Sequence, residues 1–174
     1  MGGRPRVTSD GEVVNRYRAT DMRDAAGHRQ SDLGQSDLVG VGKVRLIEFP
    51  RAEESRGSLV VGEFASLPFM PRRFFSVYGV PPGSVRGEHA HYECEQLLVA
   101  LHGSVRCTVD DGANRREIVL DSPSAALYVP ARIWGIQDDF TADAALLVLA
   151  SLPYDSGDYV NSYDDFVQLV RPQG

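Results

Sequence analysis

From about residue 43 onward, the chain shows short β-type runs rich in apolar residues, separated by turn-forming residues. This pattern is typical of the strands of an antiparallel sheet. The turns include Pro81-Pro82-Gly83 and Asp111-Gly112, whose backbone preferences suit tight reversals. Because the runs leave no room for crossover helices, they predict an all-β antiparallel sandwich or barrel. We expect strands over residues 44–49, 59–64, 73–80, 89–93, 96–101, 104–109, 116–120, 125–129 and 144–150.

Two flanking segments depart from this pattern. Residues 1–42 are rich in Arg, Asp, Gln, Ser and Gly and lack a sustained apolar period. We therefore expect a flexible N-terminal tail, followed by one domain over residues 43–174. Near the C-terminus, Phe166, Leu169 and Val170 recur at helical spacing after an Asn-Ser pair suited to capping, which predicts a short helix.

The composition narrows the function classes. A length of 174 residues with 43% apolar content suits a single domain with a real core. The net charge of −6 argues against nucleic-acid binding, and neither a signal peptide nor a membrane-spanning run is present. Cys94 and Cys107 fit no close metal-binding spacing. We expect a cytoplasmic protein with two free thiols and no nucleic-acid or membrane partner.

The chemistry is concentrated in the segment Arg86-Gly87-Glu88-His89-Ala90-His91. On a strand, residues two positions apart point to the same face, so His89 and His91 project side by side. Paired imidazoles serve either metal ligation or proton transfer, because each ring can be held neutral and titrates near physiological pH. The spacing alone leaves both chemistries open.

The residues around the pair resemble the motif of the cupins, small double-sheeted β-barrels that commonly read G-x5-H-x-H-x3-4-E-x6-G. The corresponding residues here are Gly83, His89, His91, Gln96 and Gly103. The resemblance implies a cupin double-stranded β-helix, or jelly-roll barrel. Where a metal-binding cupin has Glu, Gln96 keeps a carbonyl oxygen but lacks the charge that holds a divalent ion.

A second cupin segment, P-x-G-x-x-H, resembles residues 130–135, where Gly135 replaces the final His. Two of the four usual ligands are then absent, so we expect no bound metal. Glu95 keeps a metal-dependent alternative open, because a register shift of one residue turns it inward in place of Gln96. A purely structural role for the histidines is disfavoured, because burying two titratable groups without use is costly.

A more specific resemblance is carried by residues 55–59, 73–75, 86–91 with 96, 109–112, 120–123, 133–134 with 139–140, 148–151 and 154–166. Over roughly Val44 to Leu169, the chain resembles the sugar-nucleotide 3,4-ketoisomerases, cupin enzymes acting on TDP-4-oxo-6-deoxy-glucose. The resemblance implies an isomerase of deoxysugar biosynthesis that needs no metal or redox cofactor. It also implies a homodimer that exchanges N-terminal strands.

Moving a carbonyl from C4 to C3 requires loss of the C3 proton, an enediol, and delivery of a proton to C4. A neutral imidazole suits this work. We assign His89 to the transfer between carbons and His91 to the transfer among oxygens.

Binding of a nucleotide diphosphate sugar requires positively charged and aromatic side chains at the entrance of the site. Arg56, Arg73 and Arg86 lie in the matching segments, and a guanidinium fork suits the oxygens of a diphosphate. Trp134 is expected to stack on the base or the sugar, although a core position is the alternative reading. Gln96 completes this set of candidates as a polar group beside the histidines.

Two positions depart from the ketoisomerase pattern. Phe75 stands where a catalytic Tyr is expected, and we expect Ser76 or Tyr78 to supply the missing hydroxyl. Gly135 stands where the family tends to have His. These departures keep open a non-catalytic cupin that binds sugar nucleotides, as a regulator or pathway partner.

Overall fold

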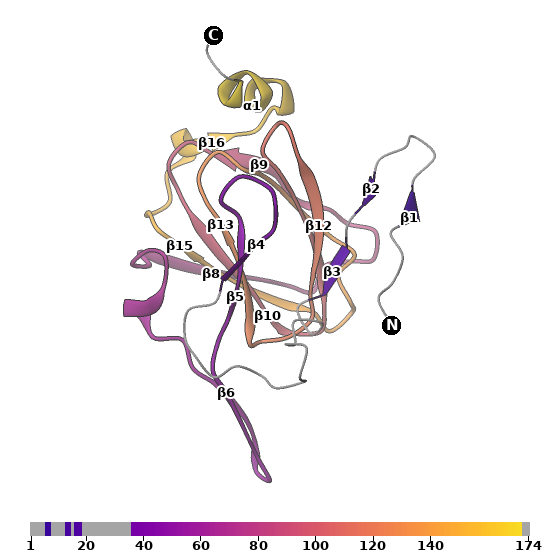
Figure 1. Ribbon diagram of the computed structural model, residues 1–174, viewed down its shortest axis with the longest axis vertical. Coiled ribbons are helices and arrows are strands. Elements are labelled where there is room, and N and C mark those ends of the chain that lie inside the picture. Colours follow the sequence, from indigo (N-terminus) through magenta and orange to yellow (C-terminus); the bar gives the residue numbers. More distant parts are fainter. Residues whose placement is uncertain (1–5, 8–12, 15, 19–35, 172–174) are drawn as a thin grey trace.

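Two six-stranded sheets face each other and form a barrel (Figure 1). The structure is a computed structural model that describes residues 6–7, 13–14, 16–18 and 36–171. The first sheet contains, in order of neighbours, β4 (Ser36–Leu38), β5 (Arg45–Glu48), β13 (Ala125–Val129), β10 (Gln96–His102), β15 (Ala145–Ala150) and β8 (Arg73–Tyr78). The second contains β16 (Tyr159–Val160), β9 (Arg86–His91), β14 (Trp134–Asp138), β11 (Val105–Asp110), β12 (Arg115–Leu120) and β3 (Arg16–Arg18).

Within these two sheets, all neighbouring strands are antiparallel except β12 and β3, which are parallel. A separate pair joins β1 (Arg6–Val7) to β2 (Val13–Val14). The predicted all-β barrel with a short C-terminal helix is confirmed.

The alternation of side chains along each strand decides what fills the barrel. In β15, Leu146 and Val148 are buried inside, whereas Leu149 packs on the outer face against Leu97 and Tyr128. In β8, Phe75 packs on the inner core, and its neighbours in sequence are exposed. The inner side chains of both sheets form one buried cluster, which includes Leu98, Cys107, Val109, Ile118 and Leu127.

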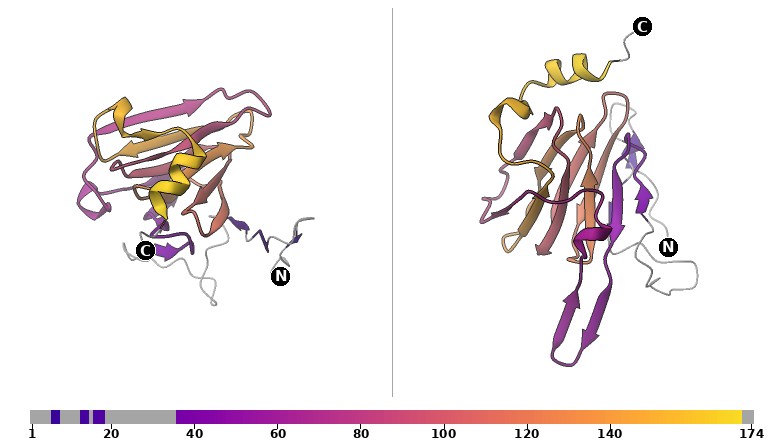
Figure 2. Two further views of the ribbon diagram at one scale, coloured as in Figure 1. Left: turned by 90° about the horizontal axis from the view of Figure 1, so that it is seen from above. Right: turned by 90° about the vertical axis from the view of Figure 1, so that its left-hand side faces the viewer.

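The segment expected to form a strand over residues 59–64 folds differently. It belongs to a two-stranded hairpin of β6 (Arg51–Glu54) and β7 (Gly57–Val60), followed by a 3-10 turn at Phe64–Ser66. The hairpin projects from the barrel at the end opposite the C-terminal helix (Figure 2). The apolar residues at this position do not form a buried face, because in β7 only Val60 is partly buried and the other residues are exposed.

The strand β14 was not among the expected strands. It runs between β9 and β11, and it places Gly135 opposite His89. Its single Gly and mixed polar residues gave no clear alternation. Its inner face nonetheless contributes Gly135 and Gln137 to the lining of the site.

The C-terminal helix α1 (Tyr163–Val170) is capped by Ser162, whose hydroxyl accepts a hydrogen bond from the backbone N–H of Asp165 at 3.3 Å. Phe166 is fully buried and packs against Trp134. The helix therefore covers the outer side of the second sheet, as the apolar spacing predicts.

Most of the predicted N-terminal tail, residues 1–42, lies outside the described residues. The described part from Ser36 onward belongs to the barrel, because β4 pairs with β5 and both Val39 and Val41 are buried in the core. No helix within the described residues is long and apolar enough to cross a membrane.

Candidate active site

A bulge in strand β9 aims the two histidines into the barrel mouth. Gly135 pairs with His89 and Ile136 pairs with Gly87, so Glu88 is the extra residue. Gly87 and Glu88 both have positive φ, at 79° and 57°. Beyond the bulge, the His89 and His91 rings meet edge to face, with centroids 4.9 Å apart. The prediction that these side chains share one face is therefore met in the structure.

Both ring nitrogens of His91 are hydrogen-bonded within the protein. Nδ1 lies 2.9 Å from Oδ2 of Asp158, and Nε2 lies 3.0 Å from the amide nitrogen of Gln96. A carboxylate only accepts and an amide nitrogen only donates, so Nδ1 carries the proton and Nε2 is the acceptor. Asp158 is itself held by the backbone N–H groups of Glu93 and Cys94, at 2.8 and 3.2 Å.

Burial lowers the pKa of His91 below its ordinary value, and the neighbouring charge of His89 adds to this effect. The hydrogen bond and the charge of Asp158 act in the opposite direction, and the nearby positive charge of Arg73 lowers the pKa further. The net effect keeps the His91 imidazole neutral at neutral pH.

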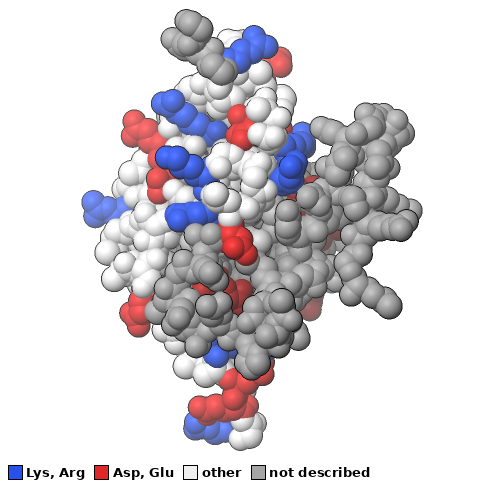
Figure 3. All heavy atoms as spheres, viewed as in Figure 1, with Lys and Arg blue, Asp and Glu red and all other residues white. Residues whose placement is uncertain are grey.

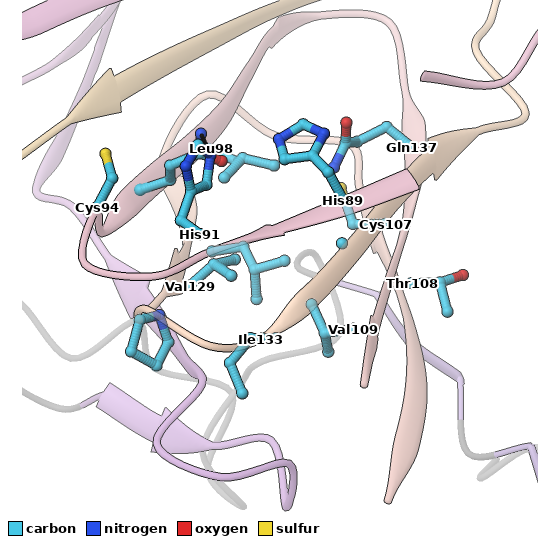
Figure 4. A pocket seen from close by; sticks show the side chains of 14 residues that line it. His89, His91, Cys94, Leu98, Cys107, Thr108, Val109, Val129, Ile133 and Gln137 are labelled. Carbon is cyan, nitrogen blue, oxygen red and sulfur yellow. Dashed lines mark hydrogen bonds between the residues drawn. The ribbon is translucent and has the colours of Figure 1, made fainter. Parts of the chain in front are cut away.

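His89 has a different arrangement. Its Nδ1 lies 3.0 Å from the carbonyl oxygen of Gly87, which can only accept, so Nδ1 donates. This tautomer leaves the lone pair of Nε2 available. His89 and His91 both line an inner cavity (Figure 4). His89 also lines an adjoining outer cavity, whose lining does not include His91.

The inner cavity is narrow, with about 20 Å³ of free space, and reaches into the apolar core. The outer cavity measures about 310 Å³, and its polar lining comes from Arg86, His89, Gln96, Gln137 and Tyr159. Cys107 lies in the wall of the inner cavity, where burial raises its pKa to about 12. Its thiol therefore stays protonated and does not act as a nucleophile.

Aromatic rings extend the site beyond the histidines. The Tyr159 ring lies 4.9 Å from that of His89 and 4.4 Å from that of His91, measured between centroids. Tyr154 lies beside Tyr159, and the Arg73 guanidinium lies 5.4 Å from the centroid of the Tyr154 ring. Among the described residues, no group hydrogen-bonds the buried Nε atom of Arg73. A guanidinium in this position is suited to an anionic ligand.

The structure brings only some of the predicted binding residues to the histidines. Gln96 bonds His91, Arg86 lines the outer cavity, and Arg73 lies close enough to influence the pKa of His91. Glu95 lies beside Tyr128 of the outer cluster, whose pKa is raised first by burial and then by the Glu95 carboxylate. The register thus turns Gln96 inward and Glu95 outward.

Four predicted residues do not lie with the histidines in this chain. Ser76 and Tyr78 are exposed on the outer face of β8, so neither supplies a hydroxyl beside Phe75, which lines the outer cavity. Trp134 faces away from the barrel interior and packs against Phe166 and the ring of Tyr163. The exposed Arg56 occupies the turn of the β6–β7 hairpin and pairs with Glu54. Acidic and basic side chains are mixed at the lower end of the molecule in Figure 3.

Sequence reasoning assigned no role to Asp158, Tyr159 or Gln137. Asp158 and Tyr159 lie in one of the matching segments, but 67 residues separate Asp158 from His91, and only the β16–β9 pairing brings them together. Gln137 lies in the strand that was not expected. No local spacing signal identifies any of the three.

The donor groups of the site do not suit a divalent metal of the cupin type. Gln96 directs its amide nitrogen toward His91, and Gly135 offers no side chain. Among the described residues, one group, His91 with Cys94 and Asp158, brings possible ligand atoms within 4.8 Å of one another. Both oxygens of that carboxylate already accept hydrogen bonds from the backbone. The group is arranged to orient His91.

A double-sheeted barrel with a histidine pair at its open end defines a cupin-type protein. The family model described as "FdtA: WxcM-like, C-terminal" matches residues 42–171. The chain belongs to this family, and the predicted resemblance to sugar-nucleotide ketoisomerases is confirmed.

Three relatives illustrate the similarity. The TDP-4-oxo-6-deoxy-alpha-D-glucose-3,4-oxoisomerase of Aneurinibacillus thermoaerophilus is 41% identical over 127 residues, which are 72% of this chain and 91% of the relative. A 3,4-ketoisomerase from Helicobacter canadensis is 34% identical with a TM-score of 0.70, covering 73% of this chain and 96% of its own. The 3,4-ketoisomerase QdtA from Thermoanaerobacterium thermosaccharolyticum, a His-to-Asn mutant in complex with TDP-4-keto-6-deoxyglucose, is 32% identical with a TM-score of 0.72, covering 75% and 95%.

Proposed function

We propose that this protein is a TDP-4-oxo-6-deoxyhexose 3,4-ketoisomerase that works by proton transfer without a metal or another cofactor. The observation that carries the proposal is the His89 imidazole, whose Nδ1 is bonded to Gly87 and whose Nε2 lone pair is available to the outer cavity. The family membership and the named activities of the relatives support the same reaction.

In the proposed mechanism, Nε2 of His89 removes the C3 proton, which the neighbouring C4 ketone acidifies. The electron pair of the C3–H bond moves into an enediol. The protonated imidazole then delivers a proton to C4, while the hydroxyl proton on O3 is transferred to O4. The product carries its ketone at C3, and no electrons are gained or lost overall.

We assign the transfer between the two oxygens to His91. Its Nδ1 proton is fixed by Asp158, so Nε2 is the basic nitrogen. The present partner of Nε2 is Gln96, which also lines the outer cavity. Exchange of this amide for a substrate hydroxyl brings His91 into the reaction.

Arg73 and Arg86 are the proposed ligands of the diphosphate. Arg73 lies near His91, and its buried Nε has no hydrogen-bond partner among the residues that the structure describes. Arg86 lines the outer cavity. Replacing either by Gln removes a charge-assisted contact and should raise KM about tenfold or more. The exposed Arg72 is the matched control, and Arg72→Gln should leave KM unchanged.

Nuclear magnetic resonance in deuterated water tests the activity directly. The protein is incubated with TDP-4-oxo-6-deoxyglucose, and the expected result is a 3-oxo product. Deuterium enters C4 in those turnovers in which the proton on His89 exchanges with the solvent before it is delivered. Protein treated with a chelator should give the same rate. Binding without conversion or exchange would support the non-catalytic sugar-nucleotide cupin, and restoration of activity by an added metal would support the metal-dependent alternative.

We also propose a homodimer and a cytoplasmic location. Phe74 and Tyr78 are 73% and 74% exposed on β8, which is an edge strand, and such a surface favours association with a second copy. The buried free thiols Cys94 and Cys107 suit a reducing compartment. Light scattering on the purified protein should give twice the chain mass of 19.1 kDa, and a monomer mass would contradict the dimer.

A further inference from the structure

Two glycines beside His89 leave room for a glutamine side chain. Gly135 and Gln137 are two residues apart on β14, and both line the inner cavity together with His89. A Cβ atom placed on Gly135 would lie 3.5 Å from Nε2 of Gln137. The Gln137 carboxamide therefore lies next to the space that a longer side chain at position 135 would fill.

Gly87 completes this arrangement from the neighbouring strand. Its φ of +79° lies in the left-handed region, which favours glycine. A Cβ atom there would lie 2.8 Å from Oε1 of Gln137 and 2.7 Å from the carbonyl oxygen of Gly135. The same glycine provides the carbonyl that orients His89. Gly87, Gly135 and Gln137 thus form one packed unit around the His89 ring, and Figure 4 shows the carboxamide beside that ring.

Gln137 differs from the other glutamine of the site. The amide of Gln96 is bonded to His91, whereas no residue in the described part of the chain hydrogen-bonds the Gln137 carboxamide. Gln137 is partly buried and lines both cavities. A half-buried amide without protein partners keeps its donor and its acceptor available to whatever occupies the cavity.

We propose that Gln137 is a substrate-binding residue that donates a hydrogen bond from Nε2 to an oxygen at C3 or C4 of the reacting hexose. This assignment rests on the proposed function. Negative charge grows on that oxygen as His89 removes the C3 proton, and a donor placed there stabilises the transition state more than the ground state. The open position at Gly135 is what allows the amide to occupy this place.

The test replaces Gln137 with Met, which keeps the length and removes both polar groups. We expect kcat to fall about 100-fold, the usual size for loss of one such donor. The affinity for TDP should be unchanged, and the affinity for TDP-4-oxo-6-deoxyglucose should fall several-fold. Gln168, exposed on α1, is the matched control, and Gln168→Met should match the wild type in all three measurements.

Thermal unfolding checks that Gln137→Met is folded, and Gln137→Asn provides a second variant that keeps the amide but shortens its reach. Asn should lower kcat by a smaller factor than Met. The proposal is overturned if both variants retain wild-type kcat and wild-type affinities. If the wild-type protein binds the sugar nucleotide without converting it, the proposed function fails. The affinity of the wild type for TDP-4-oxo-6-deoxyglucose, divided by that of Gln137→Met, then still decides whether Gln137 binds the sugar.

Discussion

His89 and His91 lie two residues apart on one strand, yet their surroundings are opposite. His89 donates from Nδ1 to a backbone carbonyl and keeps Nε2 available to the outer cavity. His91 is buried, and both of its nitrogens are bonded, one to Asp158 and one to Gln96. The shared strand face makes the two imidazoles neighbours. The hydrogen-bond partners of their nitrogens then decide which of the two histidines has a free nitrogen for the substrate.

The most severe test of this difference compares two substitutions. His89→Asn removes the base that touches carbon, and kcat should fall by about 10²- to 10⁴-fold. His91→Asn should lower kcat by a smaller factor, because transfer between oxygens also has water as a carrier. The measurement is the steady-state rate of 3-oxo product formation.

Calorimetric titration with TDP is the control for both variants, since neither histidine is proposed to bind the nucleotide. TDP affinity should stay within threefold of the wild type. Wild-type turnover in His89→Asn, or a larger loss in His91→Asn than in His89→Asn, would reverse the assigned roles.

A further substitution tests whether Asp158 orients His91. Asp158→Asn removes the negative charge that fixes the Nδ1 proton and that raises the pKa of His91. We expect kcat to fall roughly 10- to 100-fold, the size found for outer partners that orient metal-bound histidines. The pKa of His91, followed by imidazole proton resonances, should fall further below its ordinary value.

Asp155→Asn provides the control, because Asp155 caps the neighbouring 3-10 turn without contacting either histidine. Its turnover should stay close to that of the wild type. An unchanged His91 pKa in Asp158→Asn would show that the carboxylate does not act through the imidazole.

The lowered pKa of His91 also predicts a dependence of stability on pH. The unfolded chain binds a proton at His91 near its ordinary value of 6.5, and the folded chain does so only at lower pH. The stability contributed by the neutral ring is therefore complete above pH 6.5 and is lost as pH falls toward the folded pKa.

Urea unfolding at pH 7.5 and 5.5 measures this effect. The free energy of unfolding of the wild type should fall between the two values, and that of His91→Gln should fall less. Subtracting the fall in unfolding free energy of His91→Gln from that of the wild type removes the contribution of other titrating groups. Equal falls would contradict the predicted shift.

Local patterns were sufficient for the barrel and for the histidine pair. Short apolar runs bounded by turn residues identified strands such as β10 and β15, and the two-residue spacing placed His89 beside His91. The same rule failed for residues 59–64, because β7 belongs to a hairpin in which β6 is exposed throughout and only Val60 of β7 is partly buried.

The rest of the site depends on pairings between distant segments. Asp158 reaches His91 through the β16–β9 pairing, and Gln137 reaches His89 through a strand whose glycine and polar residues hide its periodicity. Such contacts are set by sheet order and by a bulge at Glu88, neither of which a single sequence displays. Trp134 was given a binding role from its type, whereas the pleat of β14 turns it outward.

The smallest expected effect on catalysis comes from the outer face of β14. Trp134 is 6% exposed and packs on Phe166 and Tyr163, away from both cavities. Trp134→Phe should therefore leave kcat and KM within about twofold, while the lost packing lowers the free energy of unfolding by about 1–3 kcal/mol. Gln137→Met, on the inner face of the same strand, should instead lower kcat and leave the free energy of unfolding nearly unchanged. A large rise in KM for Trp134→Phe would place the indole against the nucleotide. It would contradict the assignment of the outer face of β14 to packing and of the inner face to substrate binding.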